Sequence, residues 1–487
     1  MDQSGRCHRP LAGSAANGDS RIALPDGRRT PVKPDVWPLS FNHRRIPQMD
    51  PMLAPYVAVA LIFILMGGGV PVFAALALSG AAGIVLVEDF GFLMTRLKSL
   101  PYSTTAVYTL VIIPLFLLMG AFAHHAQVGK RLFSVASKWV GHLPGGLAMA
   151  SILTSAGFAA TSGSSVATAA TVGTVAMPEM KKAGYEPSLS AGAVAAGGVL
   201  GVLIPPSVLL IFYAALTETS AGKMLIAGFV PGLLTTLMFM AGIYLIARNG
   251  ASRSAVTQKA GWNETMRETT RAWQVLVLFI VVMGGIYMGL VTPTEAGALG
   301  AFAAFLMLVA YCLRHSAGLW GKLVESFRST GNTTVMILFT MIGAAVFSYF
   351  LTLVQVPNQL AQLVVESGLP PLLVMALFLL VFVPLGMFLD AFSMMVIAIP
   401  IMFPTVRSLG FDPIWFGILT VKMCEIGLIT PPVGLNCYVI AGIDRSTPLP
   451  QIFRGALWFV LMEVVTIAIL FFFPQIILWL PALMSVN

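Results

Sequence analysis

The chain has 487 residues, of which 57% are hydrophobic and 10% charged, and its formal net charge at pH 7 is +8. Soluble domains carry about 25% charged residues, so this composition excludes an ordinary soluble protein. Long apolar runs recur from residue 53 onward and predict an all-α polytopic membrane protein rather than a β-barrel. The lipid bilayer is therefore the expected environment. The positive net charge is interpreted as a signal of membrane topology, and no nucleic-acid partner is expected.

Residues 1–48 differ from the rest of the chain. They are polar, rich in Arg, Pro, Gly and Ser, and contain no hydrophobic core of a signal peptide. They are predicted to form a disordered tail. The alternative is a mis-assigned start, with translation beginning at Met49 or Met52.

The first half of the membrane part, residues 49–247, alternates apolar spans with amphipathic segments. Residues 145–178 are apolar but interrupted at 162–165, which predicts a re-entrant helical hairpin instead of one span. The polar, charged residues 248–272 are predicted to connect the two halves. Spans are predicted at 53–66, 70–87, 105–124, 188–213 and 223–247, with an amphipathic segment at 88–104 and an interfacial helix at 126–142.

The second half, residues 273–487, shows the same order of segments. A second interrupted apolar stretch, 371–403, predicts a second hairpin. Spans are predicted at 273–290, 294–313, 332–353, 413–440 and 453–482, with an amphipathic segment at 314–331 and an interfacial stretch at 355–369.

The two halves align at a fixed offset of 226 residues. At this offset Pro178 falls on Pro404, Pro205 and Pro206 fall on Pro431 and Pro432, and Ser164 falls on Asp390. We therefore predict an internal duplication. Each half has five full crossings, and an odd number places the second half inverted in the membrane. Two inverted repeats, each with a hairpin and a broken helix, are typical of secondary transporters.

Loop charges predict the orientation. Lysine and arginine concentrate in 125–144, 179–187, 248–272, 314–331 and 441–452. The positive-inside rule makes this side cytoplasmic, so both ends of the membrane part face outward, into the periplasm of a bacterial inner membrane. The arginines of residues 1–48 would then have to cross the membrane, which favours the mis-assigned start.

Several of these motifs together resemble one family, the large membrane subunit (DctM-type) of TRAP transporters, the tripartite ATP-independent periplasmic transporters. The resemblance covers about residues 50–485, and the motifs are Ser162-Gly163-Ser164-Ser165, Pro178-Glu179-Met180, Ala195-Ala196-Gly197-Gly198, Ile204-Pro205-Pro206-Ser207, Pro293-Thr294-Glu295-Ala296 and Glu425-Ile426-Gly427 followed by Thr430-Pro431-Pro432-Val433-Gly434.

The resemblance implies an elevator-type, sodium-coupled importer. It implies two partners, a small membrane subunit on a separate chain and an extracytoplasmic solute-binding protein. The implied substrates are organic acids such as C4-dicarboxylates or sialic acids. The polar residues 1–48 depart from the usual start of the family.

The hairpin tips carry the groups that such a transporter needs. Na⁺ prefers oxygen ligands, which serine hydroxyls and unwound carbonyls supply, and half-helix N-termini attract a substrate carboxylate. The alternative is that small residues allow close helix packing, which we favour for Thr168 and Thr171. The candidate substrate-binding residues are Ser162, Ser164, Ser165, Asp390 and, beyond the second break, Asn436.

The two Pro-Pro breaks lie beside these tips. Proline removes a backbone donor and clashes with the carbonyl four residues earlier, so each pair is expected to free carbonyls before it. The alternative is a plain kink. Together with the tips, the breaks give the candidate Na⁺ ligands: Ser162, Ser164, Gly198, Gly201, Pro205, Asp390, Gly427, Thr430 and Pro431.

Charged residues inside the spans need partners, because a lone charge there costs at least about 2.5 kcal/mol. Lys422 and Glu425 are three residues apart and are expected to pair, and Glu463 is expected to meet a partner helix or subunit. Glu295 is expected to cap the helix that begins at Pro293. His124 and His125 end a span, have no ligand partners nearby in the sequence, and are interpreted as solvated interface residues.

Two rival functions remain open. One is a stand-alone ion-coupled anion symporter that needs no binding protein. The other is a membrane-embedded enzyme that uses Asp390 and Glu425. The sequence contains no Walker A, His-Glu-x-x-His or Gly-x-Ser-x-Gly motif, and its four cysteines show no metal-ligand spacing, so we expect neither an enzyme nor a bound cofactor other than the coupling Na⁺.

Overall fold

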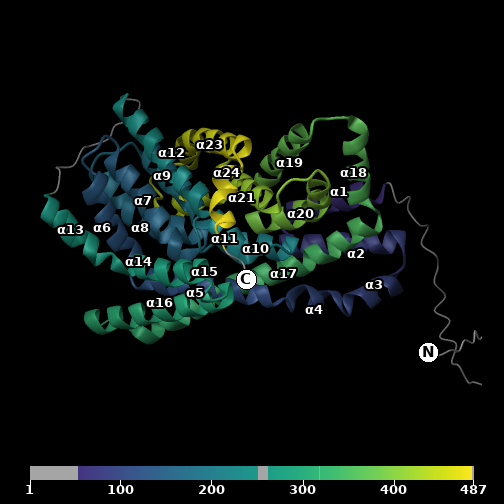
Figure 1. The fold of residues 1–487 in the computed structure, drawn as a ribbon, viewed down its shortest axis with the longest axis horizontal. Helices are drawn as coiled ribbons and strands as arrows, with labels where there is room; N and C mark the ends of the chain where they lie inside the picture. The colour runs from purple at the N-terminus through teal and green to yellow at the C-terminus, as the bar shows by residue number, and fades with distance from the viewer. Residues whose placement is uncertain (1–52, 250–260, 317, 485–487) are drawn as a thin grey trace, which may run out of the picture. The chain divides into compact units, whose positions relative to one another are not determined.

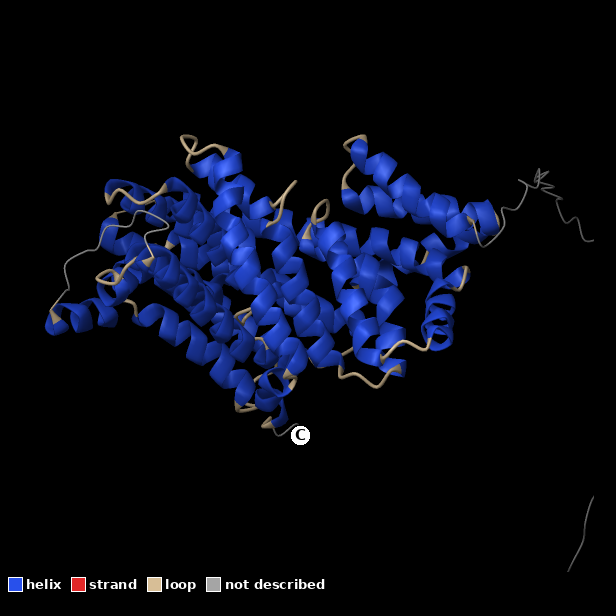
Figure 2. Cartoon of the chain, turned by 90° about the horizontal axis from the view of Figure 1, so that it is seen from above, coloured by secondary structure: helices blue, strands red, loops and turns tan. Residues whose placement is uncertain are grey.

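The computed structural model describes residues 53–249, 261–316 and 318–484 (Figure 1). In these ranges all regular structure is helical and there are no strands, which confirms the all-α class (Figure 2). The predicted tail, 1–48, lies outside the described residues, as does the middle of the predicted connector, 250–260.

The segment before the first hairpin follows the predicted order. The predicted amphipathic region 88–104 is two short helices, the first of which is capped by Asp89, whose Oδ1 accepts a hydrogen bond from Phe92 N at 2.6 Å. The helices are α1 (Ala54–Gly67), α2 (Val72–Val87), α3 (Phe90–Leu97), α4 (Leu100–Thr105), the 3₁₀ turn η1 (Tyr108–Val111), α5 (Ile112–His125) and α6 (Val128–Val140).

The first hairpin is a pair of contacting helices that meet at one glycine. Helix α7 (Gly146–Ser162) ends and α8 (Ser165–Lys182) begins at the predicted interruption. Gly163 lies between them with φ of +60°, a left-handed conformation that favours glycine. Ser164 caps α8, since its Oγ accepts a hydrogen bond from Ala167 N at 3.4 Å.

The segment after the first hairpin contains the first Pro-Pro break. Helix α9 (Pro187–Val199) passes through η2 (Leu200–Val202) to a cis peptide between Pro205 and Pro206, after which α10 (Val208–Thr217) begins. Ser207 caps α10 and its Oγ donates to the Val202 carbonyl, so a hydroxyl occupies one carbonyl that the break releases. Helices α11 (Ala221–Ala227) and α12 (Phe229–Arg248) follow.

The second half differs from the predicted spans at two places. Residues 319–331 of the amphipathic segment and the span 332–353 form one 35-residue helix, because they contain no proline and their glycines, Gly321, Gly331 and Gly343, do not break a packed helix. The last span divides before Pro474. The helices are α13 (Trp262–Arg271), α14 (Trp273–Phe279), the π-helical η3 (Ile280–Gly284), α15 (Gly285–Tyr287), α16 (Pro293–His315), α17 (Leu319–Leu353), α18 (Val356–Ser367), α19 (Pro371–Gly386), α20 (Ala391–Ser408), α21 (Pro413–Ile429), α22 (Leu435–Ile443), α23 (Leu449–Phe472) and α24 (Gln475–Ala482).

Glu295 caps α16 as predicted. Thr292 Oγ1 accepts from Glu295 N at 3.3 Å, while Glu295 Oε2 accepts from Thr292 N at 2.8 Å, which is a complete capping box.

Six helices of the described residues are long and apolar enough to cross a membrane, or up to seven if a bent pair at α13 and α14 counts as one span. The ten crossings expected from the sequence also include short helices and helices broken at Pro-Pro, so that number stays a prediction. The six are Tyr108–His125, Ala221–Arg248, Pro293–His315, Leu319–Leu353, Ala391–Ser408 and Leu449–Phe472.

Helix boundaries follow the offset of 226 residues. Helices α8 and α20 each have 18 residues and begin at Ser165 and Ala391, while α9 and α21 begin at Pro187 and Pro413. The second Pro-Pro pair also has a cis peptide. These boundaries agree with the predicted duplication, whereas inversion of the second copy in the membrane stays a prediction.

Two groups of helices position the hairpins. Helix α17 packs against α2 and α5, and α16 packs against α5, along the lower part of Figure 1. The first hairpin packs against α6 and α9, and α9 in turn packs against α23. The second hairpin packs against α21, while its helix α20 also contacts α17.

The contact between α9 and α23 depends on glycine. A Cβ atom at Gly455 would overlap the Ser188 carbonyl of α9. We expect Gly455→Ala to lower the free energy of unfolding by about 1–3 kcal/mol through overpacking. Equilibrium unfolding in detergent measures this, with Gly442→Ala as the matched control because nothing lies within 4 Å of a Cβ there. Equal stability of both variants would contradict the prediction.

Candidate functional site

The first hairpin tip is a closed network of hydroxyl and carbonyl oxygens. The Ser162 hydroxyl is buried and its Oγ lies 2.7 Å from Thr168 Oγ1. Thr168 Oγ1 also donates to the Ser164 carbonyl at 2.8 Å. Thr168, which we assigned to helix packing, therefore fixes the positions of both predicted serine ligands.

The first Pro-Pro break lies directly against this tip. Val208 N, just after the break, donates to the Gly163 carbonyl at 3.4 Å. A Cβ atom on Gly201 would lie 2.6 Å from both the Ser164 carbonyl oxygen and Thr168 Oγ1, so only glycine permits this approach. Pro205 is buried beside the same turn. The structure thus brings most of the first set of predicted ligands together.

A residue of the second half reaches into the first hairpin. Asn436, on α22, is fully buried, and its Nδ2 donates to Ser165 Oγ at 2.7 Å and to the Ala195 carbonyl at 3.1 Å. A Cβ atom on Gly198 would lie 2.9 Å from the same Nδ2. Ser165 and Asn436, both predicted to face substrate, are therefore hydrogen-bonded to each other and join the two halves.

The second hairpin tip is built differently. Asp390 is half-buried and caps α20, where its Oδ2 accepts from Phe392 N at 3.1 Å and its Oδ1 accepts from the Ser393 hydroxyl. Its carboxylate therefore already has partners. In the part of the chain that the structure describes, no hydrogen bond joins Asp390 to Thr430.

The second Pro-Pro break lies against the end of α19. A Cβ atom on Gly427 would lie 2.7 Å from Gly386 Cα, so the two backbones touch. Thr430 Oγ1 donates to the Ile426 carbonyl at 2.6 Å, so a hydroxyl also occupies a carbonyl just before this break. Pro431 is exposed, unlike the buried Pro205. The two breaks therefore sit in different environments.

Each helix that follows a Pro-Pro break packs against the hairpin of the other half. Helix α22 packs on α8, and α10 packs on α20, where Phe212 and Phe392 make an edge-to-face contact at 5.1 Å. Lys181 Nζ, at the end of α8, lies 3.7 Å from Asp444 Oδ1 after α22. Partial burial raises the pKa of the Asp444 carboxyl, but hydrogen bonds from Ser446 and Thr447 outweigh burial and hold this pKa below its ordinary value. The carboxylate facing Lys181 thus stays ionised.

A cavity of about 260 Å³ opens at the first tip. It lies between α5, the first hairpin and α17, and Ser162 and Ser164 line it together with His124 and His125. Glu325 and the buried Thr330, whose hydroxyl has no hydrogen-bond partner, line it from α17. This is the polar cavity adjoining the predicted ligands.

The two histidines, predicted to be solvated interface residues, instead line this cavity and contact residues that are distant in sequence. His124 Nδ1 lies 2.8 Å from Thr171 Oγ1 of the hairpin, and His125 Nε2 lies 3.8 Å from Glu325 Oε2 of α17. Two adjacent histidines at the end of an apolar span were the only local signal, because their partners are distant in sequence. Imidazoles and hydroxyls offer hydrogen bonds to an anion.

The charges predicted to pair inside the spans form one cluster. Lys422 Nζ lies 2.9 Å from Glu425 Oε2, 2.6 Å from Glu463 Oε1 and 2.9 Å from Thr235 Oγ1. The three charged side chains are fully buried. The pairing of Lys422 with Glu425 is confirmed, and the partner helix of Glu463 is α21. Glu425 lies within this cluster, which leaves it closed to a soluble reactant.

The sequence of the chain matches one protein family. The family model described as "Tripartite ATP-independent periplasmic transporter, DctM component" matches residues 59–476. The C4-dicarboxylate TRAP transporter large permease protein DctM of Pseudomonas aeruginosa is 40% identical over 408 residues, covering 84% of this chain and 93% of that protein. The sialic acid TRAP transporter large permease protein SiaM of Vibrio cholerae is 31% identical over 421 residues, covering 86% and 96%.

A solved structure shares the fold. The YdaH transporter of Alcanivorax borkumensis, whose crystal structure was described as having an unusual topology, aligns with a TM-score of 0.60. The alignment covers 87% of this chain and 98% of that one at 16% identity, so the likeness concerns the fold alone.

Proposed function

The chain belongs to the family of the DctM component of tripartite ATP-independent periplasmic transporters, and on that premise we propose that it is the large membrane subunit of a sodium-coupled importer of organic acids. The observation that carries the proposal is the cavity at the first hairpin tip, which predicted ligand residues and two histidines line together. A multi-pass location in a bacterial inner membrane, with both ends outward, completes the proposal.

The cavity suits a carboxylate substrate. The hydroxyls of Ser162 and Ser164, the N-terminus of α8 and the imidazoles of His124 and His125 all favour a negative group. Glu325 faces the same space and disfavours an anion directly beside it, so we place the substrate carboxylate at the hairpin side. The names of the relatives, C4-dicarboxylate and sialic acid permeases, agree with this class.

The coupling ion is proposed to bind beside the hairpin tips and the Pro-Pro breaks. The donors near the first tip, the Ser162 and Ser164 oxygens and the carbonyls at Gly198 and Gly201, are neutral oxygens of the kind that Na⁺ prefers. The second copy offers Asp390, Gly427 and Thr430. Because Asp390 is engaged by its own helix, its role is to hold the second tip in place as much as to bind the ion.

The proposed movement is that of an elevator built from inverted repeats. Cross-packing of α22 on α8 and of α10 on α20 supports motion of both hairpins and both broken helices as one unit. Helices α2, α5, α16 and α17 would remain as the scaffold. The cavity lies between the two groups, where substrate would have to leave or enter.

The experiment is uptake into proteoliposomes that contain this chain, a small membrane subunit and a solute-binding protein. We expect uptake of an organic acid only with an inward sodium gradient and only with the binding protein. Uptake without the binding protein would favour a stand-alone symporter, and chemically altered substrate would favour an enzyme.

One pair of substitutions tests the ion ligands. Ser164→Ala combined with Thr430→Val removes one hydroxyl from the first hairpin tip and one from the second Pro-Pro break. We expect the sodium concentration for half-maximal uptake to rise by at least about tenfold, since hydrogen bonds to charged groups contribute about 1.5–3 kcal/mol each. Thr352→Val with Ser367→Ala removes two exposed hydroxyls elsewhere and serves as the control. Unchanged sodium dependence would make the ligand assignment wrong.

A further inference from the structure

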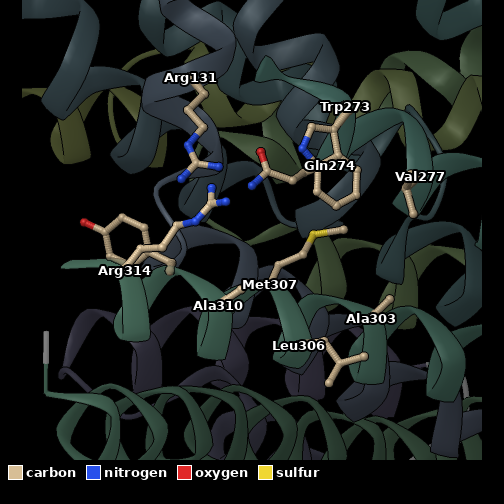
Figure 3. A pocket seen from close by; sticks show the side chains of 10 residues that line it. Arg131, Trp273, Gln274, Val277, Ala303, Leu306, Met307, Ala310 and Arg314 are labelled. Atoms are coloured by element: carbon tan, nitrogen blue, oxygen red, sulfur yellow. The ribbon is translucent and has the colours of Figure 1, made fainter. Parts of the chain in front are cut away.

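A second cavity, of about 480 Å³, lies away from the hairpins, between α6, α14 and α16. Arg131 of α6 and Arg314 of α16 line one end of it, and Figure 3 shows their guanidinium groups pointing toward one another with the Gln274 amide beside them. Two cations facing each other repel unless an anion lies between them. In the part of the chain that the structure describes, neither guanidinium has a carboxylate partner.

The groups around the two arginines also favour binding of an anion. Gln274 is 6% exposed, and its amide lies beside the two guanidinium groups (Figure 3). A third cavity adjoins this one. It is also lined by Arg131 and Arg314, and Lys130 and Glu268 are its other charged lining residues. Cations therefore outnumber acids at this end, and the Gln274 amide offers donors to the same point.

The other end of the cavity is apolar. Val277, Leu306, Met307 and Ala310 line it, and Figure 3 shows Met307 and Leu306 on the far side from the guanidinium groups. Helix α16 is a candidate membrane span, and Leu306 is exposed on its surface. A small anion such as phosphate would fill only the cationic end. A molecule with an anionic head and an acyl chain fills both.

We propose that this cavity binds an anionic phospholipid. Arg131 and Arg314 hold the phosphodiester of the headgroup, because guanidinium groups bind phosphate through paired hydrogen bonds. Trp273 is exposed and lines the cavity together with the two arginines, and tryptophan is enriched at the membrane–water interface, where a lipid headgroup lies. The acyl chain lies along α16 beside Met307. Basic pockets between membrane helices on the cytoplasmic side recognise such headgroups, and the loop charges place this end there.

A bound lipid would connect helix α6 to helix α16. Helix α6 packs against the first hairpin, whereas α16 packs against α5. The phosphate joins Arg131 to Arg314 and so removes the repulsion between these helices. The lipid would therefore stabilise the folded chain, independently of the proposed transport function.

The test is native mass spectrometry and thermal unfolding of the full-length chain in detergent, with phosphatidylglycerol, phosphatidylcholine and inorganic phosphate as the added probes. We expect phosphatidylglycerol to stay bound and to raise the unfolding temperature, and the other two to do neither. Arg131→Gln with Arg314→Gln is expected to weaken phosphatidylglycerol binding by about tenfold to thirtyfold. Lys98→Gln with Arg328→Gln removes the same charge outside the cavity and is expected to bind as the unaltered chain does.

A second variant keeps the charges and fills the space. Ala310→Trp places a large side chain on the apolar wall and is expected to abolish phosphatidylglycerol binding while the unfolding temperature without lipid stays near that of the unaltered chain. Binding that persists in both the arginine and the tryptophan variants would overturn the proposal. Inorganic phosphate that raises the unfolding temperature as much as phosphatidylglycerol would overturn it too, in favour of a small-anion site.

Discussion

Lys422→Met is expected to lower the free energy of unfolding by about 3–5 kcal/mol, because it leaves two buried carboxylates without their cation. Lys422 is the common partner of Glu425 and Glu463, and all three side chains are fully buried between α21 and α23. Methionine has similar length and packs well in an apolar core, so the loss reports the charge rather than a cavity. Equilibrium unfolding of the purified chain in detergent measures it.

Two comparisons separate the buried charge from other causes. Lys422→Met combined with Glu425→Gln and Glu463→Gln removes the whole cluster and is expected to recover most of the lost stability, since neutral replacement of a buried ion cluster is often neutral or stabilising. Lys182→Met breaks an exposed pair with Glu179 and is expected to have little effect. If the triple variant is as unstable as Lys422→Met, packing and not charge explains the effect.

Local sequence signals identified the parts of the site that local chemistry determines. Glycine, proline and serine change the backbone where they stand, so the interruption at 162–165 and both Pro-Pro breaks could be predicted, whereas the cap that Ser164 forms was not. The same reasoning predicted that Glu295 caps the helix that begins at Pro293, and its partner in the capping box, Thr292, is only three residues away.

Contacts between distant segments could not be predicted. Ser165 and Asn436 are 271 residues apart in the chain, and no local pattern indicates that they bond to each other. The cavity partners of His125 lie on α17, whose unbroken length was itself missed. Periodicity indicates which residues of a helix are apolar, but which helix covers them follows from the packing of the whole membrane domain.

The offset of 226 residues made the two Pro-Pro breaks predictable as a related pair, but not the differences between them. A duplication makes two separate breaks informative together, although each alone fits a plain kink. It does not reveal how the copies diverge. Asp390 replaces Ser164 as a helix cap, and the buried Pro205 corresponds to an exposed Pro431, so the two half-sites differ in charge and in access to solvent.

Gly201→Ala is expected to reduce sodium-dependent uptake by about tenfold or more while the chain still folds. The new Cβ atom would lie 2.6 Å from the Ser164 carbonyl oxygen and 2.6 Å from Thr168 Oγ1, so the first tip must move away from the break. A shift of a few tenths of an ångström separates the oxygens proposed to share one ion, and a tenfold loss corresponds to only about 1.4 kcal/mol. Uptake against sodium concentration measures it.

The control for Gly201→Ala is Gly442→Ala, in α22, where a Cβ atom has no neighbour within 4 Å and uptake should be unchanged. Both substitutions remove a glycine from a helical segment, so the difference between them isolates the contact with the tip. Detergent unfolding of Gly201→Ala checks that the fold survives. The substitution moves the first tip away from the first break. If a folded Gly201→Ala chain kept wild-type sodium dependence, ion binding would not depend on the distance between them, and the two would not form one ion site.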